Sequence, residues 1–229
     1  APDKPAVLEH LKSKRMSCSV YGAQYLLEAL FEGGEADHAI ALMSDDDPSY
    51  PNHWWNMIRE GSTITMESWD NDQKANIDWN HAWGAAPANL IPRYVLGVRP
   101  LEPGFGRVVI EPRLGTGDGN NGLSHASGTV PSIRGPIEVE VSENSPTTFR
   151  LRVRVPGNVT ARASLPDKGL AGAALVMDGA IVAEPLREDG RLVVADVPSG
   201  EHAIWLSATD SPTEAVLREN WKRAMFGDA

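Results

Sequence analysis

The chain has a single cysteine, Cys18, and no apolar run as long as a membrane span. One thiol cannot form a disulfide within the chain, so the cysteine content does not indicate a redox compartment. Cys18 lies near Met16 and Val20 at the start of an apolar segment, which favours a buried structural thiol. A bilayer-spanning helix needs about 18 or more consecutive apolar residues, so the sequence predicts none.

Positive charge is also scarce. The 229 residues include 21 lysines and arginines against 31 aspartates and glutamates, a formal net charge of −10. Such a surface repels nucleic acid and anionic membranes, so we expect neither as a partner. No His-x-x-x-His or cysteine-rich spacing is present, so no metal site is predicted. The hydrophobic content of 41% is enough for the core of one large domain or two small ones.

The first ten residues, APDKPAVLEH, hold neither an initiator methionine nor the apolar segment of a signal peptide. They read as the beginning of a helix inside a helical domain. We therefore expect the natural N-terminus to be missing, which leaves export undetermined.

Helical periodicity extends to about residue 98. Asp3 and Ser19 are suited to cap helices, and the pair Gly33-Gly34 is suited to end one. Pro87 and Pro92 should kink or divide the last helix, because each removes a backbone donor. Trp54 and Trp55 are assigned to a loop. The expected helices span 3–14, 19–33, 35–43 and 80–96.

Beyond residue 98 the pattern changes to short segments in which polar and apolar residues alternate, separated by turns such as Asp189-Gly190. This is typical of an antiparallel β-sandwich. It carries no binding motif, so we expect a structural cap. A last amphipathic helix is expected after Pro212. The expected strands span 107–111, 137–141, 149–155, 160–164, 174–177, 192–194 and 202–206.

The segment 61–84, GSTITMESWDNDQKANIDWNHAWG, is the richest in potential chemistry. It combines three tryptophans with four carboxylates, two asparagines near the turn and an Asn-His pair. Indole rings stack on the C–H faces of sugars, while carboxylates and amides bind sugar hydroxyls. A carboxylate so placed can also act in glycoside hydrolysis. The alternative is that the tryptophans are core residues and the acids are solvated.

Four motifs in order make the sugar interpretation specific: residues 61–70 (GSTITMESWD), 80–84 (NHAWG), 96–100 (LGVRP) and 103–106 (PGFG). From about residue 5 to at least residue 140 the chain resembles the C-terminal part of bacterial α-L-rhamnosidases of glycoside hydrolase family 78. The resemblance implies an (α/α)6 catalytic barrel followed by a β-sandwich. It divides the chain into the last barrel helices (1–98), the β-sandwich (99–209) and a C-terminal helix or tail (210–229).

The resemblance also implies site roles. Glu67 corresponds to the general base of an inverting hydrolysis, and His81 to a histidine lining the rhamnose pocket. Trp55, Trp69, Asn80 and Trp83 are further candidates for contacts with the sugar. The general acid should come from an earlier part of the barrel. We therefore expect a fragment that is not competent alone.

The predicted substrate is a rhamnose-containing glycan or glycoside, cleaved without a cofactor. The expected partner is the upstream barrel segment, in the same protein or in a companion chain. Two alternatives remain: another (α/α)6 glycosidase, such as a fucosidase-like enzyme, or a carbohydrate-binding module without catalysis. For a bacterial glycan-degrading enzyme an extracellular or periplasmic location is favoured.

Overall fold

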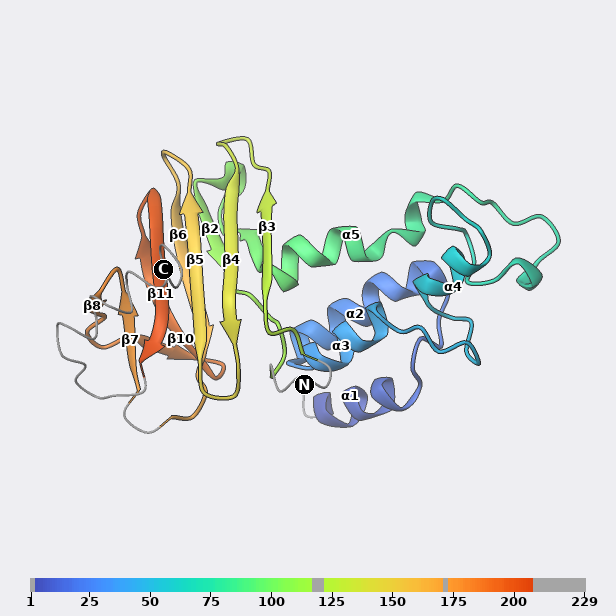
Figure 1. Cartoon of the computed structure of the whole chain (residues 1–229), viewed down its shortest axis with the longest axis horizontal. Coiled ribbons are helices and arrows are strands. Elements are labelled where there is room, and N and C mark those ends of the chain that lie inside the picture. The colour runs from blue at the N-terminus through green and yellow to red at the C-terminus, as the bar shows by residue number, and fades with distance from the viewer. Residues whose placement is uncertain (1–2, 117–121, 171–172, 208–229) are drawn as a thin grey trace, which may run out of the picture. The chain divides into compact units, whose positions relative to one another are not determined.

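The structure is a computed structural model that describes residues 3–116, 122–170 and 173–207. The chain divides into two compact units, Ala1–Ile91 and Pro92–Ala229 (Figure 1). Helices make up the ordered elements of the first unit, and strands dominate the second. Each unit is described separately.

The first unit contains five α-helices and two 3₁₀ turns in its described residues: α1 (Lys4–Ser13), α2 (Val20–Gly33), α3 (Ala36–Met43), α4 (Trp54–Arg59), η1 (Asn71–Gln73), η2 (Ala82–Gly84) and α5 (Ala86–Leu90). Helix α2 contacts α1, α3 and α5 (Figure 1). Its residues Ala23, Leu27 and Leu30 are fully buried, so α2 forms the centre of this unit's core.

The expected caps are confirmed in part. The Ser19 hydroxyl accepts a hydrogen bond from the Gly22 backbone N–H, and Gly34, with φ = 87°, forms the C-cap of the helix. Asp3 occupies the N-cap position of α1, but its side chain accepts no hydrogen bond there. Its carbonyl accepts the first helical bond, from Val7 N–H, so the helix starts where expected without a side-chain cap.

One expectation about the helices is wrong. Trp54 and Trp55 begin α4 rather than lying in a loop. The buried His53 caps this helix, since its Nδ1 accepts from the Asn56 N–H at 3.1 Å, and histidine is not a residue by which sequence reveals a cap. The expected division of the helix 80–96 at its prolines is confirmed, since this stretch forms η2, α5 and the π-helical turn η3 (Ile91–Val95), with Pro87 in α5 and Pro92 in η3.

The second unit consists of two sheets with strand orders β1-β2-β6-β10-β9 and β3-β4-β5-β11-β7-β8. The described strands are β1 (Val98–Pro100), β2 (Arg107–Ile110), β3 (Ala126–Val130), β4 (Ile137–Asn144), β5 (Phe149–Val155), β6 (Thr160–Pro166), β7 (Ala174–Met177), β8 (Ala180–Ile181), β9 (Leu186–Glu188), β10 (Arg191–Val197) and β11 (Gly200–Ser207), with a 3₁₀ turn η4 (Pro103–Phe105).

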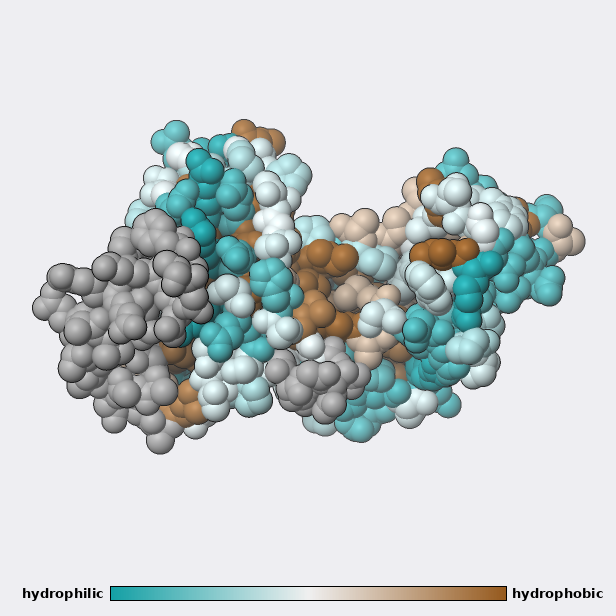
Figure 2. All heavy atoms as spheres, viewed as in Figure 1, coloured by the Kyte–Doolittle hydropathy of each residue, from teal (hydrophilic) through white to brown (hydrophobic). Residues whose placement is uncertain are grey.

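One hydrophobic cluster draws on both sheets, as in a sandwich. In β5 the residues Phe149, Leu151, Val153 and Val155 are buried in it, and the arginines between them point outwards. Figure 2 accordingly shows mainly hydrophilic residues over β4 and β5. The alternation predicted from the sequence is confirmed.

The sheets are not wholly antiparallel. Among the described strand pairs, β2 and β6 run parallel, with Val108 opposite Ala161. Strands β2 and β6 are far apart in sequence, so no hairpin turn dictates their relative direction. The helix expected after Pro212 lies outside the described residues.

Candidate functional site

The segment singled out in the sequence folds back on itself. The backbone N–H of Glu67 donates to the Asp78 carbonyl at 2.9 Å, and that of His81 donates to the Thr65 carbonyl at 2.8 Å. The Thr65 hydroxyl donates to the His81 carbonyl at 2.8 Å. We call residues 65–67 with 78–81 the stem. It places Glu67 and His81, which are 14 residues apart in sequence, on adjacent paired segments of backbone.

The Glu67 carboxylate has two partners, and both contact Oε2. Lys74 Nζ lies 2.6 Å from this oxygen, and the Asp78 backbone N–H donates to it at 3.1 Å. The Glu67 side chain is about one quarter exposed. The bond from Lys74, followed by that from the Asp78 N–H, holds the pKa of Glu67 below its ordinary value. Glu67 is therefore ionised at neutral pH, which is the state a general base needs.

His81 has one nitrogen near a carboxylate and one without a partner. Its Nδ1 lies 3.5 Å from Asp78 Oδ2. Its Nε2 is buried and has no hydrogen-bond partner among the described residues. The backbone N–H of Asn80, then His81, lowers the pKa of Asp78. An unpartnered buried ring nitrogen is costly, so this atom is a candidate for a contact with a ligand.

Aromatic rings surround His81. Tyr21 meets it edge-on at 5.7 Å between ring centroids, and Trp83 does so at 5.3 Å. The ring centroids of Tyr21 and Trp83 lie 4.4 Å apart. With Tyr25 they line a groove of about 500 Å³, a volume suited to a small ligand, which we call the aromatic groove. Its other lining residues are Gln24, Ala82, Ala85, Ala86 and Asn89.

The remaining sugar-contact candidates occupy different environments. Trp83 is 64% exposed and Trp55 is 49% exposed, so both offer ring surface. Asn80 is exposed, and its backbone N–H donates to Asp78 Oδ1 at 2.9 Å. Trp69 is 1% exposed, and its indole N–H donates to the Cys18 carbonyl. The structure thus gives Trp69 no open face on which a sugar could stack.

Close packing holds the stem in place. The Trp54 indole N–H donates to the Gly84 carbonyl at 2.6 Å, and Trp54 meets Trp69 edge-on at 5.0 Å. A Cβ added at Gly84 would lie 2.7 Å from the Met66 carbonyl oxygen. Only glycine permits this approach without displacement of the backbone. The turn that follows His81 therefore packs directly against the backbone segment that carries Glu67.

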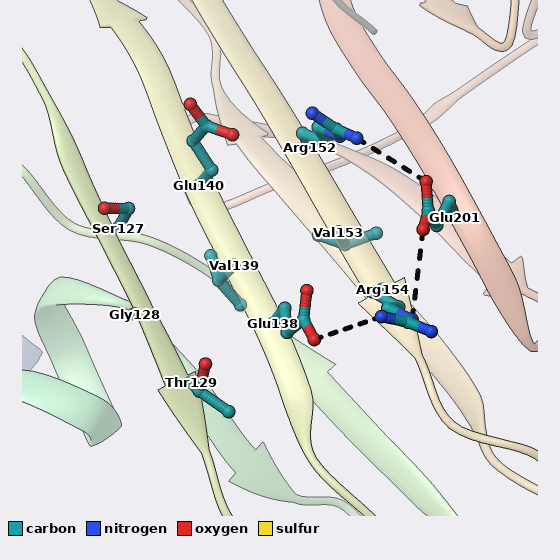
Figure 3. Close-up of a pocket in the computed structure, with 10 residues that line it drawn as sticks. All are labelled: Ser127, Gly128, Thr129, Glu138, Val139, Glu140, Arg152, Val153, Arg154 and Glu201. Atoms are coloured by element: carbon teal, nitrogen blue, oxygen red, sulfur yellow. Dashed lines mark hydrogen bonds and ion pairs between the residues drawn. The ribbon is translucent and has the colours of Figure 1, made fainter.

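A second hollow, of about 350 Å³, lies on the outer face of β3, β4, β5 and β11. Figure 3 shows Arg154 between two acids. Its guanidinium nitrogens lie 3.3 Å from Glu138 and 3.9 Å from Glu201. Arg152 lies 3.5 Å from the other oxygen of Glu201. These charges pair with one another across the strands, so this hollow is better explained as a salt-bridge ladder than as a binding site.

The described part of the chain contains no group of three or more histidine, cysteine or acidic side chains arranged to hold a metal ion. Within the same residues, no helix combines the length and the apolar character needed to cross a bilayer.

Two family models match the chain. The model of the bacterial α-L-rhamnosidase six-hairpin glycosidase domain matches residues 6–95, and the model of the bacterial α-L-rhamnosidase C-terminal domain matches residues 97–177. The first match contains the stem and the aromatic groove, and the second contains most of the strands. The chain belongs to the bacterial α-L-rhamnosidase family.

Individual rhamnosidases agree with this assignment. An α-L-rhamnosidase of Alteromonas sp. (strain LOR) is 30% identical over 148 residues, which cover 61% of this chain and 15% of that protein. The chain thus spans less than a fifth of the length of this relative.

Solved rhamnosidase structures share the fold. The α-L-rhamnosidase of Dictyoglumus thermophilum superposes with a TM-score of 0.68 at 23% identity, over 82% of this chain and 21% of that one. The Streptomyces avermitilis α-L-rhamnosidase complexed with L-rhamnose gives a TM-score of 0.66 at 26% identity, over 81% of this chain and 17% of that one. The α-L-rhamnosidase from Aspergillus terreus gives a TM-score of 0.65 at 21% identity, over 88% of this chain and 21% of that one.

Three residues of this rhamnosidase segment enter the site although sequence reasoning did not assign them to it: Lys74, Asp78 and Tyr21. For Asp78 the spacing of three residues to His81 was a usable signal. Lys74 and Tyr21 carried no such signal in the sequence. Lys74 is brought to Glu67 only by the stem, and Tyr21 is brought to His81 only by the packing of the helices.

Proposed function

We propose that this chain is the C-terminal part of an inverting α-L-rhamnosidase that hydrolyses terminal α-L-rhamnosyl bonds of glycans or glycosides. The observation that carries the proposal is the stem. It holds an ionised carboxylate, Glu67, beside His81, a ring in contact with Trp83 whose buried Nε2 has no hydrogen-bond partner in the described part of the chain. The L-rhamnose bound by the Streptomyces avermitilis enzyme supports the substrate class.

In this proposal Glu67 is the general base. It takes a proton from water while the water oxygen bonds to the anomeric carbon on the face opposite the leaving group. The glycosidic C–O bond breaks, and its electron pair leaves with the aglycone oxygen. A second carboxyl group, protonated and about 6.5–9.5 Å from the base, donates a proton to that oxygen. We assign this general acid to another part of the complete catalytic domain.

The pocket is proposed to form around His81. The Asp78 carboxylate favours a proton on Nδ1, so Nε2 of the neutral ring accepts a hydrogen bond from a sugar hydroxyl. Trp83 offers its exposed ring for stacking on the pyranose, with Trp55 and Asn80 as further contacts. Trp69 supports the stem from the core rather than touching the sugar.

The proposed architecture places residues 1–98 in the last part of an (α/α)6 barrel, 99–209 in the β-sandwich and 210–229 in a C-terminal tail. Hydrophobic residues on the surface of the helical unit support it, as Figure 2 illustrates. These exposed residues include Val7, Tyr25, Ile58 and Ile64. Such a surface suits contact with further helices, in the same protein or in a companion chain. The proposal involves no nucleic acid or membrane partner.

The test is Glu67→Gln in the complete protein, assayed on an aryl α-L-rhamnoside. The proposal predicts a fall in kcat of several orders of magnitude with little change in affinity for rhamnose. Glu9→Gln is the matched control, because Glu9 is an acid of the same unit that pairs with Lys12 and does not contact Glu67. Unchanged turnover in Glu67→Gln would favour a binding module. Hydrolysis of an aryl fucoside but not of the aryl rhamnoside by the unsubstituted protein would favour the fucosidase-like alternative.

The division of labour is tested with this chain alone and then mixed with the upstream segment. Activity only in the mixture supports an acid supplied from outside the chain. Activity of the chain alone would contradict that assignment.

A further inference from the structure

The two oxygens of Glu67 are in different situations. Oε2 accepts hydrogen bonds from both the Lys74 ammonium and the Asp78 N–H. No group among the described residues hydrogen-bonds Oε1. The side chain is only a quarter exposed, so the carboxylate has one anchored oxygen and one open oxygen.

We propose that Lys74 is a positioning residue, which with the Asp78 N–H anchors Oε2 of Glu67 so that Oε1 is the atom that receives the proton from water. A carboxylate free to rotate would present its two oxygens alternately. A charge-assisted bond to one of them fixes the plane of the group and the direction of the lone pairs on the other. This inference rests on the proposed role of Glu67.

Lys74 is itself held by its loop. It directly follows η1, whose first turn is capped by Asp70 Oδ1 accepting from the Asp72 N–H at 2.8 Å. The Asn71 amide donates to Glu60 Oε2 at 2.7 Å, which ties η1 to the end of α4. The backbone before Lys74 is therefore fixed at two points, which limits where the ammonium can reach.

Three groups of the site act electrostatically on Glu67: Lys74, the backbone dipole at Asp78, and His81. Lys74 is the strongest of them. Replacing it by an uncharged side chain leaves the Asp78 N–H in place but removes the charge. The lone backbone bond would then hold Oε2 less firmly, and ionisation of Glu67 would need a higher pH.

The first experiment is a ¹³C NMR titration of the Glu67 side-chain carboxyl in this chain. Lys74→Met should move its titration to higher pH, and Lys74→Arg should restore it. Lys12→Met is the matched control: it removes a lysine that pairs with Glu9 and Glu35 in the same unit and does not contact Glu67. An unchanged Glu67 titration in Lys74→Met would overturn the proposal, whatever the activity of the complete protein.

The second experiment measures pH–rate profiles in the complete protein. Lys74→Met should lower kcat with little change in KM and shift the acidic limb of kcat/KM to higher pH, with recovery in Lys74→Arg. A lysine that only stabilised the fold would lower activity at every pH without moving the limb, and that outcome would contradict the positioning role. If Glu67→Gln leaves turnover intact while the NMR shift is observed, the proposed function fails but the ion pair stands.

Discussion

The indole N–H of Trp69 donates a hydrogen bond to the backbone carbonyl of Cys18 at 2.7 Å, joining residues 51 positions apart in the chain. Trp69 is one of the largest fully buried side chains, and its ring also packs against Trp54. It connects the loop after Glu67 to the start of α2. This makes the stem dependent on a core contact far from it in sequence.

Trp69→Ala should therefore destabilise the helical unit by about 3–5 kcal/mol, the usual cost of truncating a buried tryptophan. Trp69→Phe keeps most of the ring but leaves the Cys18 carbonyl unpaired, which should cost about 1–3 kcal/mol. Urea unfolding followed by helical circular dichroism measures both. Trp55→Ala, at a half-exposed indole of the same unit, is the control and should change the unfolding free energy by less than about 1 kcal/mol.

Gly97→Ala should disrupt the sandwich unit. Gly97 has φ = 74°, and an added Cβ would overlap the backbone carbon and oxygen of Glu111. Strain and overlap together should exceed about 3 kcal/mol in the free energy of unfolding. Gly190→Ala is the matched control, since Gly190 has φ = 71° but nothing near the new methyl group. It should cost only about 1–2 kcal/mol. Equal losses in the two variants would show that the close approach to Glu111 is unimportant.

Glu111 is a buried carboxylate surrounded by arginines, and Glu111→Gln should be strongly destabilising. Arg113 Nη2 binds its Oε1 at 2.6 Å. Burial raises the pKa of Glu111, but the nearby charges of Arg191 and Arg113 outweigh burial, so the net shift is downward. Burial lowers the pKa of Arg191 to about 10, which still leaves it charged at neutral pH.

Neutralising Glu111 removes the charge that balances these arginines, at a cost on the order of 3 kcal/mol in the free energy of unfolding. Urea unfolding followed by β-sheet circular dichroism measures it. Glu201→Gln, on the exposed ladder of Figure 3, is the control and should cost less than about 1 kcal/mol. Similar losses would mean that the Glu111 cluster contributes no more than a surface pair.

Asp47 should give the helical unit an acid-sensitive contribution to stability. The Ser49 hydroxyl, then the Ser49 N–H and Arg15, lower the pKa of Asp47 from 3.8 to about 2. A carboxyl whose pKa is depressed by folding stabilises the folded state above its unfolded value. That contribution is complete above pH 3.8 and is lost as the pH falls through about 2.

The stability difference between the wild type and Asp47→Asn should therefore shrink as the pH is lowered across this range. Urea midpoints from about pH 2 to about pH 6 measure it. Asp46→Asn replaces the exposed neighbouring acid and is the control. A wild-type advantage that persists unchanged at the lowest pH would contradict the assignment to the Asp47 carboxylate.

Trp83→Ala in the complete protein should raise KM for an aryl rhamnoside roughly tenfold, equivalent to the loss of one aromatic stacking contact. Trp83 is 64% exposed, so the unfolding free energy should change little. Ile133→Ala, at an exposed apolar residue of the sandwich unit, should leave KM unchanged. A normal KM in Trp83→Ala would remove the aromatic groove from the proposed pocket.

The parts of the fold that the sequence predicted are those governed by local periodicity. In β5, strict alternation of arginines with apolar residues identified both the strand and its buried face. Strands β1, β3, β8 and β9 escaped prediction. In β8 and β9 the residues are exposed and lack that alternation. The parallel pairing of β2 with β6 is a long-range choice that no local pattern records.

Sequence could nominate the residue types of the candidate site but not their geometry. The position of Glu67 was indicated by its motif, yet its partner Lys74 looked like any exposed lysine of a polar loop. The three tryptophans of the segment looked alike in sequence. Packing separated them, since Trp69 reaches the Cys18 carbonyl in the core while Trp79 and Trp83 remain exposed.

The stem has a consequence for how such an enzyme can diversify. Four hydrogen bonds between residues 65–67 and 78–81 close the loop at its base. The positions of Glu67 and His81 are therefore set at this base rather than by the tip of the loop. A transplanted loop of different length could then bring new contacts to the substrate without rebuilding the base. Two features of the present loop would have to be kept: an indole at position 69 to fill the core, and one cation able to reach Oε2.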